Sequence, residues 1–81
     1  FDYAEVAEII QKIKKYDSLL DDEYGENALE MRNKIDEIED LVQKEENPSR
    51  IKALLNDIKN LSIGVAGSLI ASGIVTLLSR V

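Results

Sequence analysis

Carboxylates are the only side chains in this sequence whose grouping could support catalysis or bind a cation. The densest group runs from Asp36 to Asp40, where every residue except Ile38 is acidic. Paired carboxylates can serve as general acid and base or as ligands of a divalent cation. The chain contains no histidine and no cysteine, and neither a hydroxyl group nor a phosphate-binding loop accompanies the acidic run. We therefore interpret the run as the solvated face of a helix.

A second acidic group, Asp21 to Glu23, precedes Gly25 and superficially resembles a calcium-binding loop. With Gly25 at the sixth loop position, the first, fifth and twelfth positions are Leu20, Tyr24 and Met31. None of these supplies a suitable side-chain ligand. The sequence therefore predicts no catalytic residue, no metal site and no cofactor, and the protein is not expected to be an enzyme.

Charge is distributed unequally along the 81 residues. The first 47 residues hold 6 Lys and Arg against 15 Asp and Glu, whereas residues 48–81 hold 4 against one acid, Asp57. The net charge of −6 and the absence of a basic stripe argue against nucleic acid as a partner. No secretory signal is visible near the amino terminus. The chain begins at Phe1 rather than methionine, and we expect a single domain over 1–81 that is part of a longer protein.

Three stretches of apolar residues at helical spacing predict an all-α fold. The first helix is expected over 2–20, with Asp2 as its N-cap. The second is expected over 27–46, and the third over 48–79, after the break at Asn47-Pro48. Between the first two, a loop over 21–26 is favoured, although a continuous helix bent at Gly25 is the alternative. The first two helices would form an antiparallel hairpin against the long third helix.

The carboxy-terminal region is uncharged from Asn60 to Ser79. Its length meets the requirement for a membrane span, but the many Gly, Ser and Thr residues between 61 and 78 weaken the drive for insertion. Small residues recur at a spacing that would allow two helices to approach closely. The predicted helix–helix interface consists of Gly64, Gly67, Ser68, Ala71, Ser72, Val75 and Thr76.

Residues 57–74, DIKNLSIGVAGSLIASGI, carry a family resemblance. In its polar helix leading into a Gly-, Ala- and Ser-rich apolar helix, this segment resembles the carboxy-terminal segment of bacterial abortive-infection and similar phage-defence proteins. The resemblance covers residues 48–81 and carries over no catalytic residue. It implies a bacterial cytoplasmic setting and an accessory role within a larger effector.

A long apolar helix in so short a chain requires a second surface to cover it. We therefore expect a non-enzymatic oligomerisation or protein-interaction module. Its partner would be a second copy or the remainder of the parent protein. The alternative is a membrane-anchored or membrane-active, pore-forming segment that uses residues 61–78, with a membrane as partner and a membrane-associated location.

Overall fold

The computed structural model describes residues 1–65 and 67–80, which form helices and turns and no strand. The predicted all-α fold is therefore confirmed for this part of the chain. Four helices have ten or more residues, and a short helix and two 3-10 turns connect the first two of them. In chain order the elements are α1 (Tyr3–Lys14), η1 (Asp17–Leu19), α2 (Leu20–Tyr24), η2 (Gly25–Asn27), α3 (Ala28–Lys44), α4 (Pro48–Ile63) and α5 (Leu69–Leu78).

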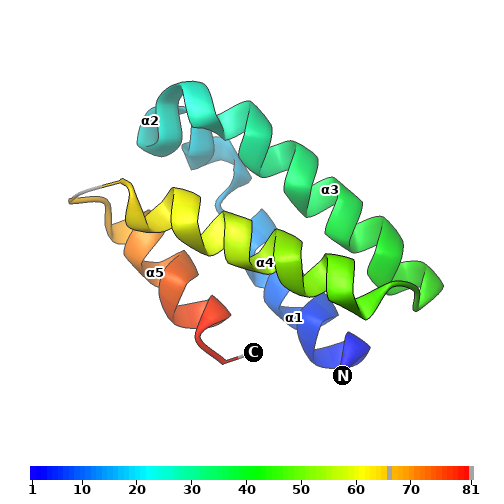
Figure 1. Cartoon of the computed structure of the whole chain (residues 1–81). Helices are drawn as coiled ribbons and strands as arrows, with labels where there is room; N and C mark the ends of the chain where they lie inside the picture. Colours follow the sequence, from blue (N-terminus) through cyan, green and yellow to red (C-terminus); the bar gives the residue numbers. More distant parts are fainter. Residues whose placement is uncertain (66, 81) are drawn as a thin grey trace.

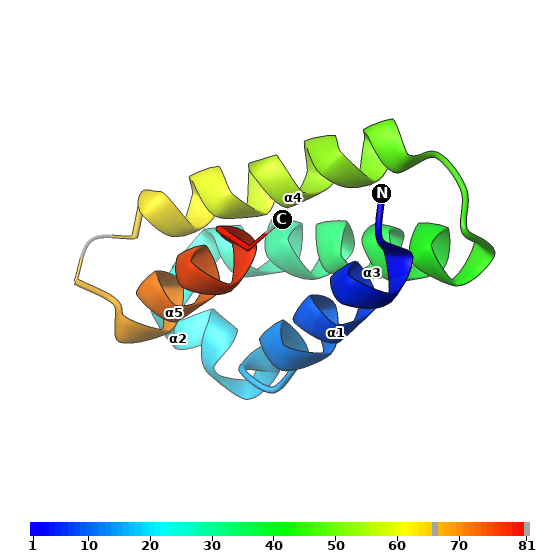
Figure 2. The ribbon, with the colours of Figure 1, turned by 90° about the horizontal axis from the view of Figure 1, so that it is seen from below.

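The longer helices form two layers. Helices α3 and α4 lie side by side and antiparallel in one layer, and α1 and α5 lie in the other (Figures 1 and 2). Helix α1 packs against α3, whereas α5 packs against α4 and reaches α1. Because α5 turns back along α4, the chain covers much of its own apolar carboxy-terminal region.

One apolar core fills the space between the layers. Each of the four longer helices buries apolar residues three or four positions apart, as expected for amphipathic helices. The largest side chains with less than 2% of their surface exposed are Val6, Ile9, Ile10, Ile13, Leu20, Met31, Ile38, Ile51, Leu54, Ile58 and Ile74. Each large aliphatic side chain buried in this way stabilises the fold by about 1.5–3 kcal/mol before entropy is counted.

The first helix is shorter than predicted. Asp2 caps α1 as expected, since its Oδ1 accepts a hydrogen bond of 3.0 Å from the Glu5 backbone amide. The helix ends at Lys14, and the backbone amide of Tyr16 then bonds to the carbonyl of Ile13, a spacing that tightens the last turn. The loop expected over 21–26 is also wrong, because α2 and η2 occupy most of that range and the chain bends at Gly25, where φ is 56°.

The break before α4 follows the prediction. Helix α3 ends at Lys44, and Asn47 caps α4 with its side-chain oxygen 3.3 Å from the amide of Arg50. Pro48 occupies the first helical position, where its missing N–H group costs nothing. The second predicted helix, 27–46, therefore corresponds closely to α3.

The single helix predicted over 48–79 is wrong, because the chain reverses between α4 and α5. Gly64 ends α4, and Gly67 adopts a φ of 80°, in the left-handed region that favours glycine. Ser68 then has extended backbone, and its Oγ accepts a hydrogen bond of 3.0 Å from the amide of Ala71, capping α5. Ala66, between the two glycines, lies outside the described residues. The two helices replace the long third helix and its unbroken stripe of small residues.

Replacing the two glycines of this turn by alanine tests the reversal. Gly67→Ala is expected to lower the free energy of unfolding by about 1–2 kcal/mol, because alanine resists the left-handed backbone. Gly64→Ala should be neutral or stabilising by up to about 1 kcal/mol, since Gly64 has a φ of −70° and an added Cβ would meet only ordinary contacts. Urea unfolding of the two variants and the parent chain measures the difference. Equal stabilisation by both substitutions would indicate the continuous helix instead.

Candidate functional site

The acidic run Asp36 to Asp40 contributes to contacts between helices. Glu39 pairs with Lys14 of α1 at 2.9 Å, and Glu37 pairs with Arg50 of α4 at 2.7 Å. These hydrogen-bonded cations lower the pKa of both glutamates from the ordinary range. In residues 1–65 and 67–80, no group of three or more metal-ligating side chains is placed to hold an ion.

The seven residues predicted as a helix–helix interface do not lie on one helix. Gly64 and Gly67 belong to the turn between α4 and α5. The remaining five begin with the cap of α5 and continue along that helix. Ser68 and Ala71 are buried within the chain's own core, Val75 is half-buried, and Ser72 and Thr76 are exposed. Whether the exposed members contact another protein stays a prediction.

The most exposed large apolar side chains of the uncharged region flank this turn. Ile63, the last residue of α4, is 61% exposed, and Leu69, the first residue of α5, is 87% exposed. We call residues 63–65 and 67–69 the apolar corner; it forms one end of the molecule (Figure 1). Large exposed apolar patches mark surfaces that bind another molecule, so these two side chains make the corner a candidate contact surface.

The outer face of α5 continues the uncharged surface. The exposed hydroxyl group of Thr76 donates a hydrogen bond of 3.0 Å to the carbonyl of Ser72, and Ser79 bonds likewise to Val75 at 2.9 Å. These hydroxyl groups already donate to carbonyl groups of their own helix, so they keep their acceptors when the face is covered. This surface is therefore less costly to dehydrate than its serine and threonine content suggests.

A buried hydrogen bond holds the corner against α2. The hydroxyl groups of Tyr24, at the end of α2, and Ser62, one residue before Ile63, are hydrogen-bonded to each other. Both residues are at least 96% buried, and burial raises the pKa of Tyr24 above its ordinary value. The acidic residues of α2 are consequently held beside the apolar corner.

A groove opens at the other end of α5. It has a volume of about 540 Å³ and is lined by residues from the amino terminus of the chain, α4 and the last turn of α5. Its floor is apolar, because Val6, Leu55 and Leu78 reach it from three helices. Lys52 lies over the ring of Phe1, with its Nζ 5.8 Å from the ring centroid.

Sequence reasoning missed the corner and the groove. The signal for the corner is present in the order of residues: Gly64 is a helix-ending glycine, and Gly67-Ser68 supplies a second glycine followed by an N-cap residue. The repeat of small residues at helical spacing instead favours a single interface on one helix. The groove had no such signal, because its lining residues are brought together only by the packing of three separate segments.

No protein-family model, curated protein or solved structure matches this chain. Nothing in these comparisons bears on the resemblance to phage-defence proteins, which stays a prediction. Among the helices of residues 1–65 and 67–80, none combines the length and the apolar character that crossing a membrane requires.

The Tyr24–Ser62 bond can be tested by removing one hydroxyl group. Tyr24→Phe leaves the buried Ser62 oxygen without this partner and should cost about 1–3 kcal/mol of unfolding free energy at neutral pH. Because the folded state raises the pKa of Tyr24, the parent chain should lose stability as the pH rises above about 10. The variant should lose less over the same range, as measured by denaturant unfolding at each pH.

The double variant Tyr24→Phe with Ser62→Ala provides the control. It removes both partners, so its cost should be smaller than the sum of the two single costs. Additive costs, together with parallel pH curves for Tyr24→Phe and the parent chain, would contradict the assigned hydrogen bond.

Proposed function

We propose that this chain is a non-enzymatic self-association module that uses the apolar corner as its contact surface. The observation that carries the proposal is the exposure of Leu69 and Ile63 within a region that has no charged residue from 60 to 79. Elsewhere the chain is rich in charge, with 32% Asp, Glu, Lys and Arg. An uncharged surface on such a chain can be buried without removing an ion from water.

The turn that forms the corner supports the proposal further. The cap at Ser68 and the buried Tyr24–Ser62 bond hold the chain on either side of the corner, at residues 62 and 68. A contact surface that is already ordered loses little conformational entropy on binding. Residues 63 and 69 would therefore bind as part of a preformed shape.

Self-association would increase the stability of so small a chain. An 81-residue domain buries a limited core, and association is one of the usual ways in which small domains increase their stability. Most soluble oligomers are assembled from copies of one chain. A second copy of this chain is thus the simplest partner, because no other protein is needed.

Leu69→Glu is expected to weaken self-association by about tenfold or more, because the change places a charge at the centre of the contact. It should leave the fold intact, since Leu69 is highly exposed and an acidic residue is favourable in the first turn of a helix. Sedimentation velocity over a concentration series measures the association, and circular dichroism verifies the helical content.

Leu29→Glu is the matched control. Leu29 is 67% exposed and also lies in the first turn of a helix, α3, so the change in side chain and helical position is comparable. Its association should remain that of the parent chain. A parent chain that stays monomeric throughout would contradict the proposal, as would equal effects of the two variants. Binding to phospholipid vesicles that only Leu69→Glu abolishes would assign the corner to a membrane surface instead.

A further inference from the structure

The apolar corner and the groove lie at opposite ends of α5. Leu69 begins this helix at the corner, and Leu78 ends it in the lining of the groove. Ten helical residues at 1.5 Å each separate the two surfaces by about 15 Å. The corner of one molecule therefore cannot enter its own groove, but it can reach the groove of a second molecule.

The chemical character of the two surfaces is complementary. The corner presents Ile63 and Leu69 without a charged residue. The groove offers the half-exposed ring of Phe1 beside its buried apolar floor. Placing an apolar side chain against this ring removes apolar surface of both partners from water. Because the apolar corner is uncharged, it does not bring a like charge to either wall of the groove.

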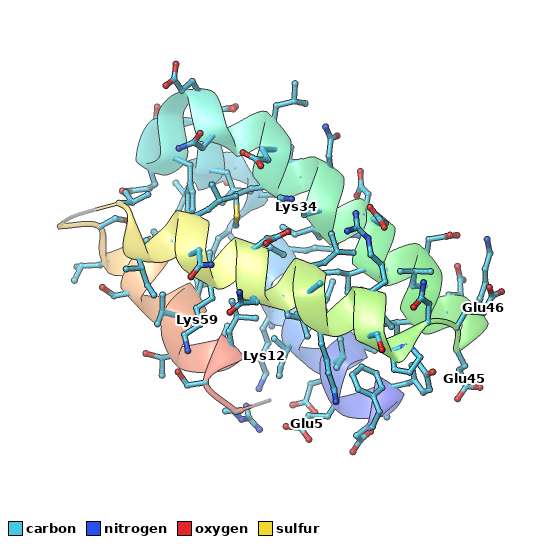
Figure 3. The ribbon with its side chains drawn as sticks, viewed as in Figure 1. Glu5, Lys12, Lys34, Glu45, Glu46 and Lys59 are labelled. Carbon is cyan, nitrogen blue, oxygen red and sulfur yellow. The ribbon has the colours of Figure 1, made fainter. Side chains whose placement is uncertain are left out.

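The walls of the groove carry opposite charges. Lys52 and Lys59 line the side formed by α4, whereas Asp2 and Glu5 line the side formed by the amino-terminal segment. Figure 3 shows Lys59 on α4 and Glu5 on α1. Neither lysine forms an ion pair within residues 1–65 and 67–80. Both cations thus lack a carboxylate partner in this part of the chain, and Lys52 lies over the Phe1 ring.

Acidic residues accompany the corner. Helix α2 carries Asp22 and Glu23, and the Tyr24–Ser62 bond fixes α2 beside the end of α4. Neither acid pairs with a cation in the part of the chain that the structure describes. A corner entering the groove with α2 toward the α4 wall would bring these acids to the lysines and away from Asp2 and Glu5. Charge complementarity therefore favours one orientation over its reverse.

We propose that the occupant of the groove is the apolar corner of a second copy of this chain, bound head to tail. This inference rests on the self-association proposed above and names the surface that receives the corner. Each molecule then offers one corner and one groove, which makes the contact heterologous. Such contacts add further copies until the assembly closes into a ring or continues as a helical filament.

The test uses two variants that each disable one half of the contact. Leu69→Glu disables the corner. Asn56→Glu disables the groove, because Asn56 is an exposed lining residue on α4 between Lys52 and Lys59, and a carboxylate there repels the acidic residues that accompany the corner. Glutamate is also a better helix former than asparagine, so α4 should persist. Sedimentation velocity is measured on the parent chain, on each variant and on their equimolar mixture.

Head-to-tail binding predicts a specific outcome. Each variant alone should associate about tenfold or more weakly than the parent chain. The equimolar mixture should recover a one-to-one dimer with close to the parent affinity, because it retains one intact corner and one intact groove. It should stop at the dimer, whereas the parent chain continues to larger species as its concentration rises.

Two other results overturn the inference in distinguishable ways. If the parent chain associates but the mixture of variants recovers nothing, the contact is not between corner and groove, although self-association stands. The same holds if Asn56→Glu associates as the parent chain does. If the parent chain is monomeric, the proposed function and this inference fail together. Circular dichroism of both variants verifies that lost association does not reflect lost folding.

Discussion

The backbone reversal at Gly67 and Ser68 is the constraint on which the rest of this structure depends. Were α4 to continue through these residues, Ile74 and Leu78 would project away from the core that now buries them. The positive φ of Gly67 and the cap from Ser68 to Ala71 instead direct α5 back along α4. The same reversal leaves Ile63 and Leu69 outside, because they flank the bend. The burial of Ile74 and Leu78 and the exposure of the corner thus both result from this reversal of the backbone.

The all-α fold class could be predicted from sequence because it depends on local periodicity. Asp2 and Asn47-Pro48 also marked the starts of helices correctly, since capping is decided within a few residues. The reversal was missed because two interpretations of the same glycines and serines compete. A stripe of small residues favours close helix packing, whereas Gly67 followed by Ser68 favours a stop and a start. Only the packing of Ala71 and Ile74 against the other helices decides between them.

The charged residues illustrate a second limit of local reasoning. The acidic run was interpreted as a solvated face, and its members remain at the surface. Their partners, however, come from other helices: Glu39 meets Lys14, and Glu37 meets Arg50. Arg32 similarly contacts Asp17 and Asp21, so that α3 holds the short segments that precede it. Spacing along one helix predicts pairs three or four residues apart, but pairs between helices follow from the tertiary fold.

The same reversal explains why the apolar corner and the groove are placed at the two ends of α5. This helix is only ten residues long, shorter than the sixteen-residue α4 on which it packs. At its start the bend exposes a corner that the core cannot cover. Toward its end, residues of α1 and α4 line an open groove beyond Leu78. A short helix on a longer one therefore creates a projection and a recess in the same molecule. In the proposed head-to-tail contact, the separation of the two surfaces along α5 leaves each added copy with a free corner or groove, which favours a ring or a filament.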